Sequence, residues 1–325
     1  MAMEYGNVPG VEKPISRIVQ GMMQVDSKDE AKGFALLDAV WEQGCRAFDT
    51  ARVYGDKDSF LGKWINARGI REQVVVLAKG AHHSSLRKRV TSFDIGADLH
   101  DTLAAMQTDY IDLYVLHRDD PDYPVGPLVE ALNQYVREGK IRAFGGSNWG
   151  VERLQEANEY ARARGLIPFA CSSPNYSLAE QMKEPWAGCV TISGPQNEAA
   201  RRWYAAQKMP LFTWSSMAGG FWSDRFERDN LDTFTSGLDK VCADSYGYAP
   251  NFQRLDRVRE LARAKGVSVP QIALAYILND RDLNIFALVG SSTGAEFADN
   301  LKALDLKLSE QERAHIDLRA DSPGG

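Results

Sequence analysis

Cysteine is scarce in this sequence of 325 residues, which has only Cys45, Cys171, Cys189 and Cys242 and no CxxC pair. Few and widely spaced cysteines are typical of reduced, buried thiols rather than of a disulfide framework or a zinc site. Long apolar runs are also missing, since no segment reaches the roughly 18 residues that a membrane span requires. The beginning, MAMEYGNVPG, lacks the basic and apolar parts of a signal peptide. We therefore predict a cytoplasmic protein with no metal site and no membrane partner.

Positive charge is not in excess, because 38 Lys and Arg face 44 Asp and Glu, giving a net charge of −6. A polyphosphate backbone would be repelled over most of the surface, so we expect no nucleic-acid partner. The G-x-G-x-x-G motif of Rossmann folds does not occur. Tyr204 and Lys208 match the Y-x-x-x-K spacing of short-chain dehydrogenases, but no Gly-rich turn precedes them. We therefore set both of these dinucleotide-binding folds aside.

What the sequence does contain is a regular alternation of short apolar segments and helical segments. Its composition, 44% hydrophobic and 25% charged, is that of a globular protein. The predicted strands are residues 18–20, 45–50, 74–79, 111–117, 141–145, 169–173, 211–215 and 285–290. This alternation is typical of parallel strands joined by crossover helices. We predict an α/β fold, a (β/α)8 TIM barrel, with residues 1–325 in a single domain.

Several segments around and between these strands carry signals of their own. Gly6, Pro9 and Gly10 indicate a hairpin that caps the barrel floor. Helical spacing of apolar residues predicts helices at 31–42, 128–137, 255–265 and 269–279. Residues 219–250, between the last two strands, form the longest gap and are rich in Gly, Asp, Ser and aromatic residues. An excursion of this length inside a compact fold is typical of a lid or binding loop.

Four ionisable side chains fall at or just beyond predicted strand ends, where TIM barrels assemble their active sites. Asp49, Lys79 and His117 lie at the ends of the second, third and fourth strands, and Tyr54 follows Asp49 in its loop. Taken singly, Asp49 could cap a helix, Lys79 could reach solvent, and His117 could be a core histidine without a catalytic role. Together they suit carbonyl reduction, in which Tyr54 donates a proton and His117 orients the carbonyl oxygen. Lys79 would lower the pKa of the phenol, and Asp49 would hold Lys79 in place.

The order of motifs along the chain adds to this interpretation. Residues 49–55 read Asp-Thr-Ala-Arg-Val-Tyr-Gly, and Lys79, Leu116-His117 and Gly146-Ser147-Asn148 follow in order. On these motifs the chain resembles the aldo-keto reductase family over essentially its whole length. The resemblance implies that Asp49, Tyr54, Lys79 and His117 form a catalytic tetrad. It also implies that the hydride comes from NAD(P)H bound in an extended conformation across the barrel mouth.

The same resemblance implies a set of cofactor contacts. Ser147 and Asn148 would hold the nicotinamide carboxamide, and Trp214 would stack on the nicotinamide ring. The implied pyrophosphate contacts are Ser215, Ser216, Met217, Ala218 and Gly219, and the implied adenosine contacts are Gly290, Ser291, Ser292, Glu296 and Asn300. Gly21, Met22 and Ser173 complete the predicted cofactor site.

Two of these residues depart from the family pattern. Ser173 stands where the family usually has Gln, three residues before Tyr176. Glu296 stands where many members have a cation that binds the 2′-phosphate of NADP, and a carboxylate there would repel that phosphate. The resemblance favours NADP, whereas Glu296 leaves NAD open. Arg225, in the long loop, is either a phosphate contact or a solvent-facing residue.

The predicted partner is a small-molecule carbonyl compound or the corresponding alcohol, and the sequence does not indicate an oligomeric state. We assign to the barrel mouth the apolar and aromatic residues Met22, Met23, Trp64, Trp149, Phe221 and Trp222. Polar residues expected beside them, His82, His83, Asp119 and Asp120, favour a carbonyl derived from a sugar or polyol. One alternative stays open, in which the barrel binds nicotinamide without catalysis, as a regulatory or channel-associated subunit. A metal-dependent hydrolase is disfavoured because His82 and His83 would point in opposite directions on a strand.

Overall fold

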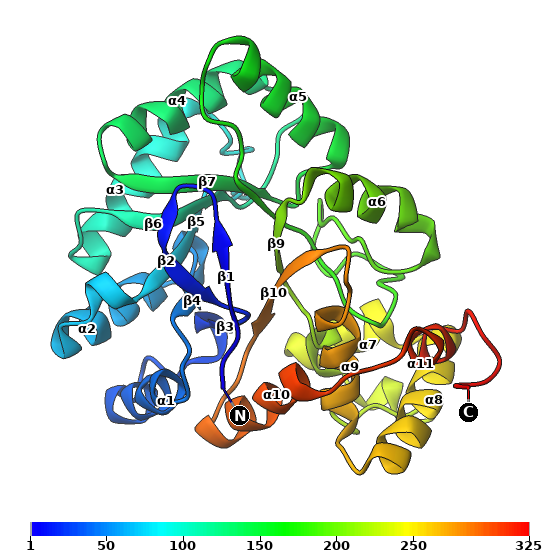
Figure 1. Cartoon of the computed structure of the whole chain (residues 1–325). Coiled ribbons are helices and arrows are strands. Elements are labelled where there is room, and N and C mark those ends of the chain that lie inside the picture. Colours follow the sequence, from blue (N-terminus) through cyan, green and yellow to red (C-terminus); the bar gives the residue numbers. More distant parts are fainter. Residues whose placement is uncertain (1, 325) are drawn as a thin grey trace.

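A computed structural model describes residues 2–324 of the chain (Figure 1). Its strands are β1 (Tyr5–Val8), β2 (Val11–Ser16), β3 (Ile18–Gly21), β4 (Ala47–Asp49), β5 (Val75–Gly80), β6 (Ile111–Leu116), β7 (Ile141–Ser147), β8 (Cys171–Ser173), β9 (Pro210–Thr213) and β10 (Asn284–Val289). Its α-helices are α1 (Glu30–Glu42), α2 (Lys57–Arg68), α3 (Ser92–Met106), α4 (Val125–Arg137), α5 (Val151–Ala163), α6 (Glu198–Gln207), α7 (Gly237–Tyr246), α8 (Ala249–Lys265), α9 (Val269–Leu278), α10 (Gly294–Asp305) and α11 (Glu310–Ile316).

Eight of the strands close into a parallel barrel in the order β10-β3-β4-β5-β6-β7-β8-β9, and helices surround it (Figure 1). Each strand lies beside its neighbours in sequence, and β10 closes the ring by pairing with both β3 and β9. Helices cover the outer face of the sheet, so most strand positions are buried on both faces and the strands read as apolar runs rather than as alternating patterns. The predicted (β/α)8 TIM barrel is confirmed.

The N-terminal hairpin of β1 and β2 closes the floor of the barrel. Val8, Val11 and Ile15 belong to the same buried cluster as the side chains inside the barrel, among them Leu77 and Phe286. An ion pair of 2.8 Å fastens the hairpin, from Lys13 in β2 to the buried Asp112 in β6. The structure thus confirms the hairpin that glycine and proline indicated. By closing this end, the hairpin leaves the opposite end of the barrel for ligands.

The helices follow the predicted apolar spacing with local differences. In α1 the buried face runs through Leu36, Leu37 and Val40, while Phe34 and Trp41 lie at its edge. The predicted helix 269–279 is confirmed as α9. Helix α8 begins six residues before the predicted start at 255. Tyr248 lies in extended conformation just before it, and Pro250 lies in its first turn. Proline is tolerated there because the backbone N–H groups of the first turn have no partner within the helix.

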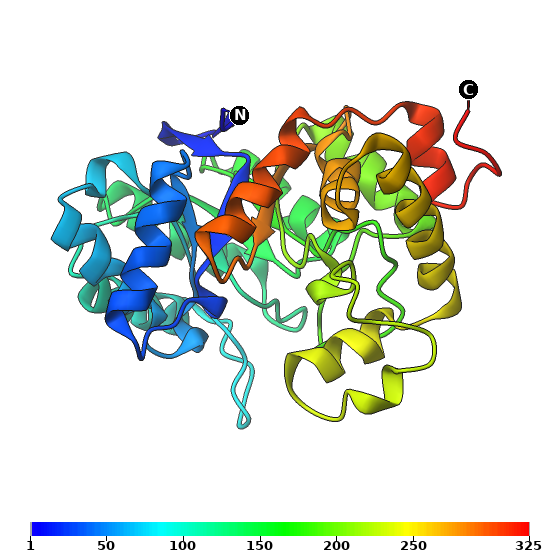
Figure 2. The same ribbon diagram turned by 90° about the horizontal axis from the view of Figure 1, so that it is seen from below.

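Two long excursions extend from the C-terminal end of the barrel. Figure 2 shows them on the side away from the N-terminal hairpin: the loop after β5, in cyan, and the segment that leads into α7, in yellow. The segment 219–250 therefore contains a helix and lies at the end expected for a lid or binding loop. Among residues 2–324, no helix has both the length and the apolar character needed to cross a membrane.

Candidate active site

The four predicted catalytic residues come together at the C-terminal ends of adjacent strands. Asp49 is the last residue of β4, Lys79 lies near the end of β5, and His117 follows β6. Tyr54 ends a short 3-10 turn that follows β4. Because these three strands are consecutive in the barrel, the four side chains lie on one wall of a shared cavity.

Lys79 and Asp49 form a buried ion pair, with 2% and 4% of their surfaces exposed. The Lys79 Nζ also donates to the carbonyl oxygen of Thr50 at 3.3 Å and lies 5.3 Å from the centre of the Tyr54 ring. Burial alone would lower the pKa of Lys79, but the interactions with Asp49 and, second to it, with Tyr54 outweigh burial, and the net shift is upward. Lys79 is therefore an ammonium ion at neutral pH.

The phenol of Tyr54 is protonated at neutral pH. Burial raises its pKa above the ordinary value of 10.0, and the charge of Lys79 acts against burial without overcoming it. The charge of Lys79 thus acts in the predicted direction, downward, although the net shift of the Tyr54 pKa is upward because burial is the larger influence. The protonated phenol is nevertheless the form that can donate to a developing alkoxide.

His117 is neutral and lies between Tyr54 and His82. Its ring is edge-on to both, with ring centres 5.8 Å from Tyr54 and 4.8 Å from His82. Burial, reinforced by the positive charge of Lys79, lowers the pKa of His117 well below its ordinary range. Its Nδ1 is buried and has no hydrogen-bond partner within the described residues. A neutral imidazole at this place can donate one hydrogen bond to a carbonyl oxygen.

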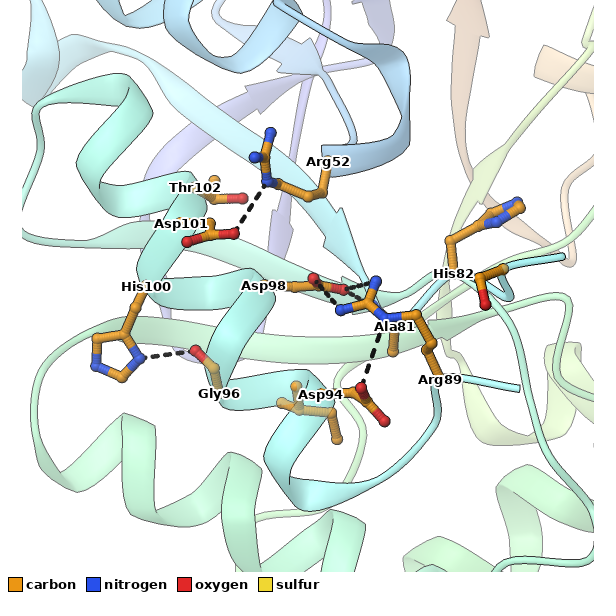
Figure 3. Close-up of polar contacts among 12 residues, drawn as sticks. Arg52, Ala81, His82, Arg89, Asp94, Gly96, Asp98, His100, Asp101 and Thr102 are labelled. Carbon is orange, nitrogen blue, oxygen red and sulfur yellow. Dashed lines mark hydrogen bonds and ion pairs between the residues drawn. The ribbon is translucent and has the colours of Figure 1, made fainter. Parts of the chain in front are cut away.

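Asp98 fixes the loop that carries His82 (Figure 3). Its carboxylate accepts a 2.8 Å hydrogen bond from the backbone N–H of Ala81 and pairs with Arg89 at 2.7 Å. Ala81 has a φ of 57°, in the left-handed region that a residue with a side chain adopts only when its surroundings hold it there. The chain turns sharply after β5 as a result, and His82 lies against His117.

The cavity at this end of the barrel has a volume of about 930 Å³. Known ligand pockets span roughly 300–1,000 Å³, so it can hold a large ligand. The predicted cofactor residues that line it are Gly21, Ser147, Asn148, Trp214, Ser215, Ser216, Met217, Gly219, Gly290, Ser291, Ser292, Glu296 and Asn300. Met22, Ser173 and Ala218 are fully buried and do not line it. The structure thus brings together most of the predicted set from four different strand ends.

Ser147 and Asn148 are held firmly by the protein itself. The Ser147 hydroxyl donates to the carbonyl oxygen of Ser173 at 2.9 Å. The Asn148 amide donates to the carbonyl oxygen of His117 at 3.3 Å and accepts from the backbone N–H of Val190 at 3.1 Å. These bonds tie the ends of β6, β7 and β8 to the loop that follows β8.

The segment after β9 turns tightly along the cavity. Ser215, Ala218, Gly219 and Gly220 all have φ values between 49° and 98°. Such turns let the backbone approach a bound anion closely. Arg225 lines the cavity as well as being exposed, and pairs with Asp239 at the start of α7 at 2.9 Å. The long excursion therefore closes over this part of the cavity through an ion pair.

At the start of α10 the cavity wall is acidic. The Glu296 carboxylate accepts a 2.7 Å hydrogen bond from the backbone N–H of Ser292. Asn300 donates to the Ser291 hydroxyl at 3.2 Å. Asp299 also lines this end. Among the described residues, the lysines and arginines that line the cavity are Lys79, Arg118 and Arg225, and none of them belongs to this segment.

Several aromatic residues assigned to the mouth are instead in the core. Trp64, Trp149, Phe221 and Trp222 are all buried and do not line the cavity. The Trp64 indole N–H donates a hydrogen bond to the carboxylate of Asp38 in α1, so its one polar group is satisfied within the core. Met23 does line the cavity and is 46% exposed. Residues 2–324 also hold no group of three metal-ligating side chains close enough to bind an ion.

Sequence reasoning missed three further residues that line the cavity. Arg118 directly follows His117 and lines the cavity, so its position at a strand end was an available signal. Trp186 and Cys189 also line it, from the loop after β8. The Trp186 ring lies 6.4 Å from that of Trp214. That loop has no apolar periodicity, and nothing in the sequence indicates which of its residues face inward.

Comparison with known proteins agrees with this geometry. The aldo/keto reductase family model matches residues 17–319. An aryl-alcohol dehydrogenase [NADP(+)] of Phanerodontia chrysosporium is 28% identical, over 94% of this chain and 82% of that protein. The uncharacterized oxidoreductase YrpG of Bacillus subtilis is 26% identical, over 99% of this chain and 98% of its own length.

A solved structure shares the fold. The thermostable aldo-keto reductase Tm1743, solved in complex with the inhibitor epalrestat, superposes with a TM-score of 0.72 at 22% identity, covering 98% of this chain and all of that one. Because the family model spans almost the whole chain, the protein belongs to the aldo/keto reductase family of nicotinamide-dependent oxidoreductases.

Proposed function

We propose that the protein reduces an aldehyde or ketone to an alcohol, or catalyses the reverse oxidation, with NAD(P)H as the hydride donor. The observation that carries this proposal is the meeting of a protonated Tyr54, the Lys79–Asp49 pair and a neutral His117 on one cavity wall. The cavity has room beside this wall for a dinucleotide and a small substrate.

The residues of the cavity fit a nicotinamide dinucleotide. Trp214 offers an aromatic face, and the strained turn from Ser215 to Gly220 offers a closely approaching backbone. Arg225, although paired, brings a cation to the same side for the pyrophosphate. When bound, the reduced nicotinamide supplies the hydride. Ser147 and Asn148 would then face the carboxamide from the end of β7.

The chain's own residues supply the proton and the electrostatic support. Tyr54 donates its phenolic proton to the carbonyl oxygen as that atom acquires alkoxide character. The Lys79 ammonium stabilises the tyrosinate that remains, and Asp49 keeps Lys79 charged and in place. His117 orients the carbonyl oxygen by a hydrogen bond. Lys79 and Asp49 are already paired before substrate binds, which lowers the cost of reorganisation.

For the substrate we propose an aromatic carbonyl compound. Trp186 and Met23 line the same cavity as the tetrad and offer aromatic and apolar contact. The named activity of the Phanerodontia chrysosporium relative, on aryl alcohols, agrees with this choice. A carbonyl derived from a sugar or polyol is the second candidate, favoured by the polar His82 beside His117.

Cofactor oxidation with a panel of carbonyl compounds tests this proposal. We expect loss of reduced-nicotinamide absorbance with aromatic aldehydes and slower loss with sugar aldehydes. The opposite ranking would favour the sugar-derived candidate. Tight cofactor binding without turnover of any compound, in either direction, would instead support the non-catalytic role as a regulatory or channel-associated subunit.

The charge of Glu296 should set the preference between the two nicotinamide cofactors. Its carboxylate lies at the predicted adenosine end, where the described residues supply no lining cation. We expect Glu296→Arg to tighten NADPH binding relative to NADH by about tenfold or more, because a repulsive contact to the 2′-phosphate becomes attractive. Titration of both cofactors into the wild type and the variant measures the change. Glu310→Arg, an exposed charge reversal in α11, is the matched control. An unchanged preference in Glu296→Arg would show that the 2′-phosphate lies elsewhere.

A further inference from the structure

Arg118 is a cation in the cavity wall with no acidic partner. It follows β6 directly and lines the cavity, yet only 6% of its surface is exposed. Its side chain makes one hydrogen bond, from Nη1 to the carbonyl oxygen of its neighbour His117 at 3.1 Å. Among residues 2–324, no carboxylate forms an ion pair with its guanidinium, and most of its five donors are left for another acceptor.

The other buried or cavity-lining cations of this chain are paired. Lys79 binds Asp49, and Arg225 binds Asp239 at 2.9 Å. Arg254, with 2% of its surface exposed, binds both Glu180 and Asp317. A guanidinium stays charged at any ordinary pH, so burying one without a counter-charge is costly. Arg118 differs from these paired cations, and a bound anion would supply the counter-charge that it lacks.

The charged groups near Arg118 offer it no unpaired carboxylate. Its guanidinium is close enough to help lower the pKa of His117, after the larger contributions of burial, Lys79 and His82. Next to it in the sequence, Asp119 is already paired with Arg153 at 3.1 Å. On the wall that carries the tetrad, Asp49 balances the charge of Lys79 and His117 is neutral, so the charge of Arg118 is the one without a counter-charge.

The barrel order separates Arg118 from the predicted phosphate sites. In the ring of eight strands, β6 lies directly opposite β10, which precedes the segment 290–300. The tight turn after β9 is three strands from β6 around the ring. Arg118 instead shares its side of the cavity with His117, and Cys189 from the loop after β8 is close enough to sense its charge. An anion at Arg118 would therefore belong to the substrate.

We propose that Arg118 binds a carboxylate of the substrate while the substrate's carbonyl oxygen lies at Tyr54 and His117. The substrate class is then an aldehyde or ketone that also carries a carboxylate, with an aromatic ring as the spacer that suits Trp186. This inference rests on the proposed carbonyl reduction. A guanidinium can bind a carboxylate through two parallel hydrogen bonds, which fixes orientation as well as adding affinity. Arg118 is thereby a specificity-determining residue.

Pairs of charged and neutral substrates test this role. We would measure kcat/KM for the three isomeric formylbenzoates and for the matching formylbenzamides, which have nearly the same shape without the charge. The wild type should prefer at least one carboxylate over its amide by about tenfold to a hundredfold, the range typical of a hydrogen bond to a charged group. Arg118→Met should abolish that preference by lowering kcat/KM for the carboxylate to the value that the same variant shows for the amide. Arg118→Lys should restore part of it, since it keeps the charge but loses the bidentate geometry.

The charge-matched control is Arg225→Met, which removes a lining arginine that already has a partner. It should leave the ratio of carboxylate to amide unchanged even if cofactor binding weakens. An identical ratio in the wild type and in Arg118→Met would overturn the inference while the proposed reduction stood. If no aldehyde is reduced, the proposed function fails. Benzoate binding to the wild type but not to Arg118→Met, followed by tryptophan fluorescence, would still support the anion site, and equal binding to both would overturn it.

Discussion

Tyr54→Phe should lower kcat for carbonyl reduction by about 10²-fold to 10⁴-fold, the contribution typical of a positioned general acid. The change removes one oxygen from a half-buried ring and leaves the ring itself in place. The Kd for reduced cofactor should remain within about twofold, because the Tyr54 hydroxyl is the proton donor and not a contact of the dinucleotide. Steady-state kinetics combined with a fluorescence titration of the cofactor measures both quantities.

Tyr204→Phe is the matched control for this prediction. Tyr204 lies in α6, is 1% exposed, and shares a 3.0 Å hydrogen bond with the Ser172 hydroxyl away from the cavity. Its loss should leave kcat unchanged. The pair also separates two mechanisms, since Tyr204 and Lys208 have the spacing of short-chain dehydrogenases. Full activity in Tyr54→Phe together with inactivity in Tyr204→Phe would transfer the role of proton donor to α6.

Lys79→Met should both inactivate and destabilise the protein. Removing one partner of a buried ion pair leaves the other charge unpaired, and such changes cost about 3–5 kcal/mol of unfolding free energy. Turnover should fall at least as far as in Tyr54→Phe, because the tyrosinate formed on proton transfer loses its counter-charge. Urea unfolding followed by circular dichroism measures the stability.

The pH dependence of that destabilisation has a defined sign. Burial already raises the pKa of Asp49 in the wild type, and loss of Lys79 removes the main opposing influence. In the variant the folded state therefore holds the Asp49 proton more tightly than the unfolded state does. Stability of this kind is present below the ordinary carboxyl pKa and is lost as the pH rises through the raised value. We expect the deficit of Lys79→Met relative to the wild type to be smallest in acid and to grow toward neutral pH.

A double variant separates stability from catalysis. Asp49→Leu combined with Lys79→Met replaces the pair by apolar side chains and leaves no unpaired buried charge. It should recover most of the lost unfolding free energy but none of the activity. If Lys79→Met unfolded at the same urea concentration as the wild type, the buried ion pair would contribute nothing to the free energy of unfolding. If the double variant regained turnover, Lys79 would have no role in the chemistry.

The sequence was informative wherever a local signal determined the structure. Apolar segments of strand length predicted all eight barrel strands, and residues such as Asp49 and His117 could be placed because they end such segments. Helix α8 extended beyond its prediction because tertiary contacts of Phe252 and other residues before 255 buried a turn that apolar spacing alone did not reveal. That the chain is a single domain stays a prediction.

Burial and pairing were beyond the reach of sequence reasoning. Trp64 and Trp149 are residues of a type common in binding sites, but residue type alone does not indicate whether a side chain lies in the cavity or in the core. Both lie in the core. Met22, Ser173 and Ala218 neighbour lining residues, yet each is fully buried and does not line the cavity. Arg118 was overlooked for a related reason. Its significance lies in the lack of a carboxylate partner, and that lack is visible only once the strands are assembled.

Transfer of deuterium from a nicotinamide labelled at C4 tests the proposed chemistry most directly. The wild type, supplied with reduced cofactor that carries deuterium at both C4 positions and with an aromatic aldehyde, should place one deuterium on the carbinol carbon of the alcohol, as read by mass spectrometry. Tyr54→Phe should form the same labelled alcohol far more slowly. Alcohol without deuterium, or oxidation of the cofactor without any alcohol, would contradict hydride transfer to a carbonyl at the Tyr54 wall of the barrel.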